Sequence, residues 1–400
     1  MSYSIPEHWG RVSLGELTSD TRPICYGVLK PGPYVIGGVP LVRITDISEN
    51  IFDDSHLHLI SEELDKEFSR SKLIGGEILI SIQGTIGRVA ICPEQYEGAN
   101  ISRTIAVIEP DSRVDKQFLY WFLRYYGARD LFDAFGATRA SLNISTLREL
   151  DVPLPPLKEQ KRIAAILDKA DALRQKRQQA IQLADEFLRS VFLDMFGDPV
   201  TNPKGWDELV LKDIANIRSG VTKGKKVDPE LAVTLPYMRV ANVQDGYLAL
   251  DDIQYITVSE RDAENCRLSK GDILLTEGGD PDKLGRGHVW NDEIKNCIHQ
   301  NHIFSVRVLD NEFVRPEFLS SVISSSRGKR YFLKVGKQTT GIATINKTVL
   351  SEFEPFIPPV TLQDKYLTIV KKANSIKNSF NVNDNALFNS ISQKAFAGGL

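Results

Sequence analysis

Two glycine-rich loops carry side chains that could contact the phosphates or base edges of a nucleic acid. Each loop follows a short apolar run, at residues 82–88 and 277–286. The first offers Gln83, Thr85 and Arg88, and the second offers Lys283 and Arg286. Amide, hydroxyl, ammonium and guanidinium groups are common partners of phosphates and bases. For either loop alone, an ordinary glycine-rich hairpin with solvated charges is the alternative.

A second group of polar and basic side chains precedes each of two long helical patterns. Residues 322–350 contain six Lys or Arg and no acidic residue, which makes this the clearest basic stretch of the chain. Phosphate and base contacts are one interpretation, and a solvated basic face is the other. The candidates are Arg139, Ser141 and Asn143 in the first half of the chain, and Lys337, Gln338, Thr339 and Thr340 in the second.

Landmarks recur in the same order in the two halves of the chain, which indicates an internal duplication. The apolar run at residues 39–42 ends in Arg43 and returns at residues 235–238 with Arg239, so these two arginines join the candidates for DNA contact. The runs at 76–81 and 271–276 also correspond, as do the helix starts at 114–119 and 314–319. The offset stays between 195 and 203 residues, so the repeated unit is far longer than a solenoid repeat.

Composition describes a soluble globular protein of two or three domains. The chain has 400 residues, of which 42% are hydrophobic and 25% charged, and its net charge is −3. No apolar run reaches the roughly 18 residues of a membrane span, and the N-terminus lacks a signal peptide pattern, so a cytoplasmic location is expected. Because the overall charge is slightly acidic, a DNA-binding role requires locally concentrated basic residues.

Motifs for catalysis or metal binding do not rise above chance. The glycines near Gly220 and Gly285 lack the spacing of a P-loop or a dinucleotide fingerprint. Strand alternation places Cys297 and His299 on one face and His302 on the other, which disfavours a metal site. The four cysteines have no C-x-x-C spacing, and buried free thiols are expected. The residues themselves therefore give no support to a catalytic site, and we expect no metal-binding residue.

Two long helices follow the two globular segments. Residues 157–196 run without Gly or Pro, and apolar side chains recur at alternating steps of three and four residues. A similar pattern starts at Thr361, where Asp364 suggests a capping box, and Gly197 suggests the end of the first helix. Low helix propensity at residues 381–385 predicts a break or bend. Since each helix leaves the equivalent corner of its domain, the pair should be antiparallel.

The predicted fold class is α+β, with two tandem-duplicated globular α/β domains separated by an antiparallel pair of long helices in a coiled coil. This arrangement has a pseudo-two-fold axis. The predicted divisions are a first globular domain at 1–156, a long helix at 157–197, a second globular domain at 198–359 and a second helix at 360–400. Two related but different surfaces at a fixed separation would act as a caliper.

The chain resembles the specificity (S) subunit of type I restriction-modification enzymes. The most specific motifs are LPPLKEQ at residues 154–160, MFGDP at 195–199, KGW at 204–206 and the ending SISQKAFAGGL at 390–400. The resemblance spans the whole chain. One departure is Ser81-Ile-Gln83, because relatives often carry an Arg there.

The resemblance implies a non-catalytic DNA-binding protein. Each globular unit would be a target-recognition domain for one half of a split double-stranded DNA site. The helices would be a spacer that recruits two methyltransferase (M) subunits, and restriction (R) subunits would join the complex. S-adenosylmethionine would be bound by the M subunits, and ATP with Mg by the R subunits, with no cofactor in this chain.

A rival interpretation is a coiled-coil adaptor whose two domains bind proteins and recognise no DNA. The mild acidity and the long helices favour it. An enzyme that works alone is a third interpretation. Salt dependence separates the first two, because phosphate contacts release counterions and DNA binding should weaken steeply as salt rises.

Overall fold

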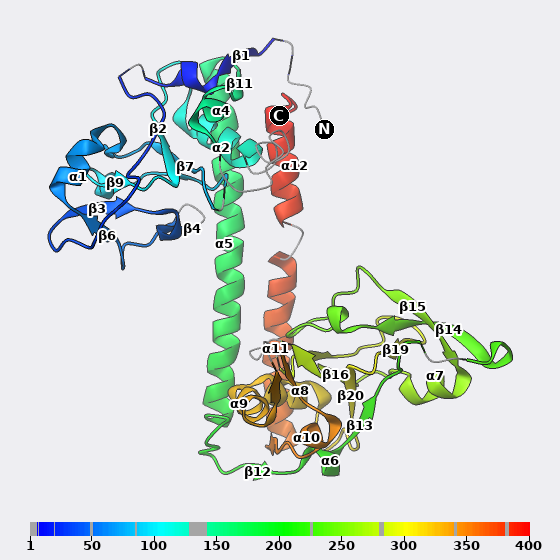
Figure 1. Ribbon diagram of the computed structural model, residues 1–400. Helices are drawn as coiled ribbons and strands as arrows, with labels where there is room; N and C mark the ends of the chain where they lie inside the picture. Colours follow the sequence, from blue (N-terminus) through cyan, green and yellow to red (C-terminus); the bar gives the residue numbers. More distant parts are fainter. Residues whose placement is uncertain are drawn as a thin grey trace. The chain divides into compact units, whose positions relative to one another are not determined.

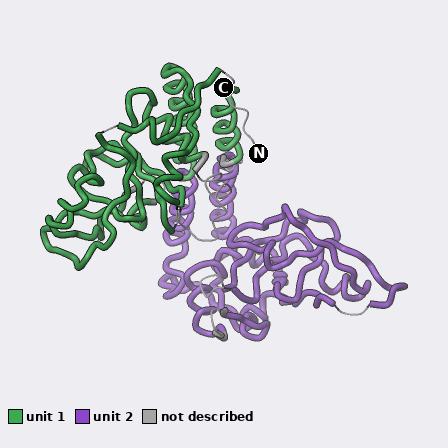
Figure 2. Tube along the Cα trace, turned by 45° about the horizontal axis from the view of Figure 1, so that its top comes forward, with its two compact units in different colours: residues 1–178, 381–400 green, residues 179–380 purple. Residues whose placement is uncertain are grey.

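The computed structural model describes residues 6, 8–19, 21–48, 51–84, 86–127, 142–224, 227–279, 284–339, 342–380 and 384–400. The chain forms two compact units, coloured separately in Figure 2. Unit 1 comprises residues 1–178 and 381–400, and unit 2 comprises residues 179–380. The four-part division made from the sequence stays a prediction, because each unit combines a globular part with segments from both long helices.

Unit 1 contains short strands and a few helices, as the α+β prediction requires (Figure 1). Its four-stranded sheet has the order β2-β10-β7-β8, its three-stranded sheet the order β6-β3-β9, and β1 pairs with β11. The strands are β1 (Gly10–Ser13), β2 (Cys25–Tyr26), β3 (Val39–Val42), β4 (Ile47–Ser48), β5 (Ile51–Phe52), β6 (His58–Ile60), β7 (Ile78–Ser81), β8 (Val89–Ile91), β9 (Asn100–Ile101), β10 (Ile105–Ile108) and β11 (Asp151–Leu154). The helices of the globular part are α1 (Glu62–Glu67), α2 (Lys116–Gly127) and α4 (Ile144–Arg148).

Unit 2 repeats this strand order and therefore confirms the duplication. Its four-stranded sheet has the order β13-β20-β16-β18, one three-stranded sheet has the order β15-β14-β19, and β12 pairs with β23. The strands are β12 (Asp207–Glu208), β13 (Ala215–Ser219), β14 (Ala232–Met238), β15 (Gln254–Ser259), β16 (Ile273–Thr276), β17 (Gly278–Gly279), β18 (Gly287–Val289), β19 (Ile298–His299), β20 (Ile303–Val308), β21 (Lys337–Thr339), β22 (Ile342–Thr344) and β23 (Phe356–Ile357). The helices of the globular part are α6 (Leu211–Ile214), α7 (Glu260–Cys266), α8 (Pro316–Ser324), α9 (Ser326–Val335) and α10 (Lys347–Ser351).

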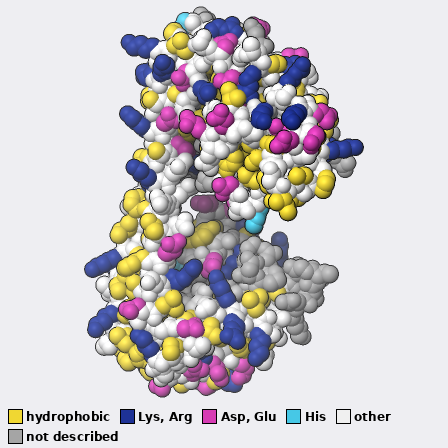
Figure 3. Space-filling view, turned by 90° about the vertical axis from the view of Figure 1, so that its left-hand side faces the viewer, with side chains coloured by type: hydrophobic (Ala, Val, Ile, Leu, Met, Phe, Trp, Pro, Cys, Tyr) yellow, Lys and Arg dark blue, Asp and Glu magenta, His cyan; other side chains and the backbone are white. Residues whose placement is uncertain are grey.

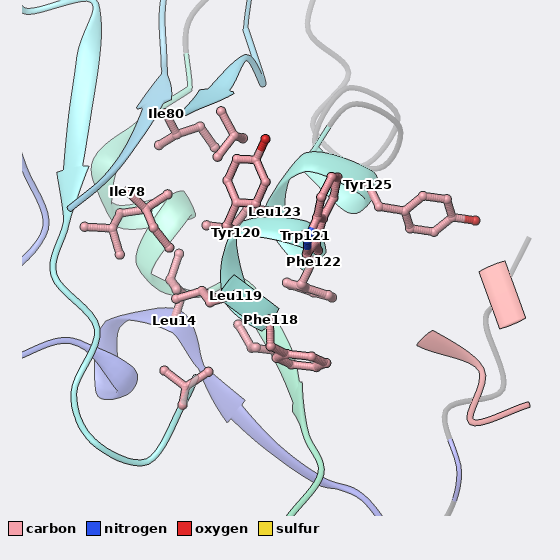
Figure 4. Close-up of a cluster of buried hydrophobic side chains, with 14 of the residues drawn as sticks. Leu14, Ile78, Ile80, Phe118, Leu119, Tyr120, Trp121, Phe122, Leu123 and Tyr125 are labelled. Carbon is pink, nitrogen blue, oxygen red and sulfur yellow. The ribbon is translucent and has the colours of Figure 1, made fainter. Parts of the chain in front are cut away.

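Helix α2 anchors the main core of unit 1. Figure 4 shows its side chains clustered with Leu14, Ile78 and Ile80 of the neighbouring elements. Phe118 is 0% exposed and Phe122 is 1% exposed. Burying an apolar side chain of this size contributes roughly 1.5–3 kcal/mol, so α2 fixes the sheet whose strands lead into the candidate loops.

Helix α5 (Leu157–Phe196) is the predicted first long helix, and both units contain part of it. It ends before Gly197, whose positive φ of 83° and hydrogen bond to the Leu193 carbonyl close the last turn. The second long pattern forms α11 (Val360–Phe380) in unit 2 and α12 (Asp384–Phe396) in unit 1. Of the predicted break at residues 381–385, residues 381–383 lie outside the described residues, and residues 384 and 385 belong to the first turn of α12.

Contacts in each unit confirm that the helices pair antiparallel. In unit 1, the Arg174 guanidinium lies 5.6 Å from the centre of the Phe388 ring. The Arg162 guanidinium, earlier in α5, donates to the Leu400 carbonyl, later in the chain. In unit 2, the last turns of α5 contact the beginning of α11. The ring centre of Phe196, the last residue of α5, lies 5.5 Å from that of Tyr366 in α11. Later residues of one helix thus meet earlier residues of the other.

The predicted capping box at the start of the second helical pattern is wrong. Helix α11 begins at Val360, one residue before Thr361, and the Leu362 amide donates to the Pro359 carbonyl. The Asp364 carboxylate instead accepts from the Arg315 guanidinium at 2.7 and 3.0 Å. This bond also lowers the pKa of Asp364. A partner distant in sequence has replaced the local cap.

Two equivalent glutamines connect the long helices to the globular parts. Gln160 is fully buried, its side-chain oxygen accepts from the Asp115 amide at 2.6 Å, and its nitrogen donates to the carbonyls of Pro155 and Arg113. Gln363 is also fully buried and binds three backbone groups in the same pattern, with the Arg315 amide as donor at 2.8 Å. Each glutamine ties the start of a long helix to the segment that enters α2 or α8.

Replacing Gln160 with Ala should lower the free energy of unfolding by roughly 2–4 kcal/mol, because buried backbone groups lose their partner. Thermal unfolding of the assembled protein measures the effect. Gln178→Ala, which changes an exposed glutamine of the same helix, is the matched control. Equal melting temperatures for the two variants would contradict the assigned role of Gln160.

Candidate DNA interface

In unit 2, the two predicted candidate segments are neighbours in space. Strand β17, in the glycine-rich loop, pairs with β22, and β22 pairs with β21. The Ile345 amide also donates to the Glu277 carbonyl at 2.8 Å. One part of the loop after β16 and one part of the basic stretch, strands β21 and β22, therefore form one small sheet.

Unit 1 contains an equivalent connection. The Leu142 amide donates to the Ile82 carbonyl at 2.8 Å, and Ile82 directly follows β7 as Glu277 directly follows β16. The residue after β7 therefore contacts Leu142, two residues before α4. In both units the described parts of the two candidate segments meet at the residue that follows the equivalent strand.

The structure gives Arg43 and Arg239 partners within the protein. The Arg43 guanidinium donates to both Asp46 carboxylate oxygens, at 3.1 and 3.0 Å, and to the His56 carbonyl at 3.0 Å. The Arg239 guanidinium donates to the Asp252 carboxylate at 2.7 Å and to its carbonyl at 3.0 Å. Their side chains are 37% and 28% exposed. Both arginines stabilise the turn after a strand, and a DNA contact at either stays a prediction.

Arg88 and Arg286 occupy equivalent positions after the glycine-rich loops. The Arg88 guanidinium donates to the Ile47 carbonyl at 2.8 Å and to the Ile44 carbonyl at 3.4 Å, so part of its hydrogen-bonding capacity is used internally. The Arg286 side chain is half-buried, and its Nε has no hydrogen-bond partner among the described residues. The two arginines therefore differ in how many of their hydrogen-bond donors have partners within the protein.

The structure describes some of the remaining candidate residues fully, some by their backbone alone, and others not at all. Gln83 is half-buried at the start of its loop, and Asn143 is exposed at the N-cap of α4 without a side-chain capping bond. The backbone of Lys337, Gln338 and Thr339 forms β21, but their side chains are not described. Outside the described residues lie Thr85, Arg139, Ser141, Lys283 and Thr340.

The basic stretch at residues 322–350 is less uniform in its roles than its composition suggests. The Arg327 guanidinium binds the Glu208 carboxylate at 2.6 Å and the carbonyls of Pro199 and Glu354, so this arginine is structural. Arg330 and Lys334 lie one helical turn apart on α9, and both are exposed. On the molecular face shown in Figure 3, basic and acidic side chains are interspersed.

Each unit also has a buried, paired carboxylate that the sequence did not predict. From the sequence, this residue was only part of a repeated strand. Glu77 and Asp272, each directly before β7 or β16, are fully buried. Glu77 accepts from the Arg22 guanidinium at 2.9 Å, whereas Asp272 accepts from Arg218 at 2.8 Å and from Arg307 at 2.6 Å. The only available signal was an acidic residue at the same place in both repeats.

The cysteines and histidines do not form a shared site among the described residues. All four cysteines are free, and burial raises the pKa of the Cys92 and Cys297 thiols to about 12, which makes them poor nucleophiles. His299 Nδ1 lies 3.0 Å from the Cys266 carbonyl, and His302 Nδ1 lies 2.6 Å from the Glu277 carboxylate. Among the described residues, no group of three metal-ligating side chains could hold an ion.

Buried His299 should make the stability of unit 2 depend on pH. Desolvation lowers its pKa from 6.5 to about 4, so the unfolded chain binds more protons between these values. Stability should therefore fall as pH drops from 6.5 towards 4, by about 3 kcal/mol from this group alone. The measurement is thermal unfolding at pH 7 and pH 5. His299→Asn should be less stable at pH 7 but show a smaller pH slope, and an unchanged slope would contradict the assignment.

A known protein family matches most of the chain. The sequence profile described as "Type I restriction modification DNA specificity domain" matches residues 6–183 and 203–385. The chain belongs to this family. The two matched ranges confirm that it contains two specificity domains in tandem, and the resemblance identified from the sequence is thereby confirmed. The chain is a non-catalytic DNA-recognition subunit of a type I restriction-modification system.

Individual relatives agree with this assignment. The specificity subunit is 30% identical to the EcoBI specificity subunit of Escherichia coli over 207 residues, which are 49% of this chain and 43% of that protein. It is 23% identical to the EcoKI specificity subunit of the same species, over 99% of this chain and 90% of that protein. Identity to the StySPI subunit of Salmonella potsdam is 22%, with the same shares covered.

Solved structures confirm the fold of the specificity subunit. The crystal structure of a type I S subunit from M. genitalium matches with a TM-score of 0.55 and 15% identity, over 99% of this chain and 97% of that chain. A chain from a structural study of type I complex assembly matches with a TM-score of 0.54 and 16% identity, over the full length of both.

In the part of the chain that the structure describes, no helix has the length and apolarity required to cross a bilayer.

Proposed function

We propose that each globular domain of this specificity subunit reads one half of a split, asymmetric double-stranded DNA target. The observation that carries the proposal is the repeated connection between the glycine-rich loop and the following candidate segment, through Ile82 in unit 1 and Glu277 in unit 2. The hydrogen bond that makes this connection is the same in both units, but the loop sequences differ. Different side chains on the same framework should recognise different base pairs, so the two half-sites should differ.

The long helices supply surfaces for the other subunits of the complex. In unit 2, Leu183, Phe187 and Ile376 are each more than half exposed, and in unit 1 Leu387 is 51% exposed. Apolar side chains exposed along a helix favour a protein partner. Two M subunits and the R subunits are the proposed partners. S-adenosylmethionine would then be bound in the M subunits and ATP with Mg in the R subunits, all in the cytoplasm.

DNA binding by the assembled complex tests this function. The chain, co-expressed with its methyltransferase subunits, should bind duplex DNA with an affinity that falls steeply between 50 and 200 mM salt, as expected for a protein that makes several phosphate contacts. It should also prefer one sequence over unrelated duplexes. A protein-binding adaptor would assemble with its partners but show neither property, and that result would exclude DNA recognition.

A further inference from the structure

A three-residue turn in each unit is held by the same set of backbone hydrogen bonds. In unit 1 the turn between β9 and β10 is Ser102-Arg103-Thr104, and in unit 2 the turn between β19 and β20 is Gln300-Asn301-His302. Four backbone bonds of 2.8–3.1 Å hold each turn. They are Ser102 N to Val42 O, Arg103 N to Val28 O, Ile82 N to Thr104 O and Ile105 N to Ser102 O in unit 1, and Gln300 N to Met238 O, Asn301 N to Val221 O, Glu277 N to His302 O and Ile303 N to Gln300 O in unit 2.

A glycine allows the close approach that both turns require. Gly27 and Gly220 precede the residues that accept from the turn, and a Cβ added to either would collide with the carbonyl of Ile101 or His299. The turn residues Ser102 and Gln300 also form equivalent parallel bridges, with Val28 and Val221. Equivalent bonds and equivalent glycines place the three side chains of each turn at matching positions in the two units.

The side chains at these matching positions are different, and several form no hydrogen bond within the described part of the protein. Arg103 and His302 are exposed, and Asn301 and Gln300 are half-buried. Among the described residues, no side-chain hydrogen bond is found for Arg103, Gln300 or Asn301. The Glu277 carboxylate engages Nδ1 of His302, which leaves Nε2 as the second ring nitrogen for an external partner. The fold therefore preserves the backbone of the turn and varies its hydrogen-bonding groups.

Each turn adjoins the candidate DNA interface. Ile82 accepts from Leu142 through its carbonyl and donates to Thr104 through its amide, so one residue joins the glycine-rich loop, the segment before α4 and the turn. Glu277 does the same in unit 2, between Ile345 and His302. In unit 1, the turn also lines a pocket of ≈ 630 Å³ together with Lys30 and Arg43.

We propose that these two turns are base-reading elements, each for one half-site, with Arg103 and Asn301 as specificity-determining residues. The proposal rests on the function proposed above. A guanidinium fork matches O6 and N7 of guanine, and a carboxamide matches N6 and N7 of adenine. Arg103 therefore favours a guanine in the half-site of unit 1, whereas Asn301 favours an adenine in the half-site of unit 2.

The test uses the complex of the full chain with its methyltransferase subunits. The probes are duplexes that carry the target mapped for the unaltered complex, and every single-base variant of that target. Arg103→Ala should lose about 10-fold or more of the discrimination at one base pair of one half-site, and Asn301→Ala should do so only in the other half-site. Arg70→Ala and Asn311→Ala change exposed residues elsewhere in the same units and are the matched controls.

Two further measurements, of folding and of a second substitution at each position, make the outcome decisive. Melting temperatures equal to that of the unaltered complex show that the variants are folded, and Arg103→Gln and Asn301→Ser provide second substitutions at the same positions with the same expected result. A uniform loss of affinity for all duplexes would indicate a phosphate contact and overturn the proposal, as would unchanged discrimination. If the unaltered complex itself had no preferred sequence, the proposed function would fail, and this result is distinct from a failure of the turns alone.

Discussion

Removal of one heptad from each of the paired helices is expected to abolish methylation of the original target. Deleting residues 176–182 from α5 and 380–386 from the C-terminal helical region retains the pairing of Asp185 with Lys377 in unit 2 and of Arg174 with Phe388 in unit 1. Seven residues shorten a helix by about 10 Å, which corresponds to about three base pairs of DNA. If the helices set the spacing, modification at the original spacing should fall at least about 100-fold.

The control for this deletion keeps the helix length and changes its surface. Alanine at exposed Lys176, Gln178 and Gln182 should leave the methylated motif unchanged. The deletion variant should recognise the same half-sites with a shorter spacer, or should fail to bind. Methylation of the original site with its original spacing would rule out the helices as the spacer.

The double substitution Arg330→Ala and Lys334→Ala should weaken DNA binding of the complex roughly 10- to 100-fold at near-physiological salt. Both side chains are exposed on α9, which leads directly into β21 of the candidate interface. Removing two phosphate contacts should also reduce the slope of log affinity against log salt by about 2. Fluorescence anisotropy with labelled duplex at several salt concentrations measures both quantities.

A second pair of exposed lysines in unit 2 separates a specific contact from a change in net charge. Lys270 and Lys295 precede β16 and β19, whereas the candidate loop follows β16. Lys270→Ala and Lys295→Ala together remove the same charge but should leave the salt slope nearly unchanged. If both double variants weakened binding equally, α9 would have no special place in the DNA interface.

Most of the fold could be predicted because it is repeated in the sequence. The paired landmarks predicted the duplication, and the uninterrupted pattern at residues 157–196 predicted α5 with its correct bounds. The helix starts near Lys116 and Pro316 were also correct. The capping box at Thr361 was wrong because the competing partner of Asp364 is Arg315, a residue of another element that sequence spacing cannot reveal.

The candidate site could be predicted only in outline. Composition identified the loops that Ile82 and Glu277 connect, but it did not distinguish an arginine available to DNA from one that the protein uses itself. Arg327 pairs with Glu208, which is 119 residues away in sequence. Our reasoning also missed the turns at Arg103 and Asn301, because their resemblance lies in backbone hydrogen bonds, whereas their side chains differ.

This specificity subunit should read two different half-sites in one DNA target. Single-molecule sequencing of genomic DNA from cells that carry the chain and its methyltransferase subunits tests it most directly, with cells that lack only this chain as the control. We expect one new methylated motif, with two unlike half-sites separated by an unread spacer and centred about one helical turn apart. The absence of a new motif, or a continuous palindromic motif, would contradict it.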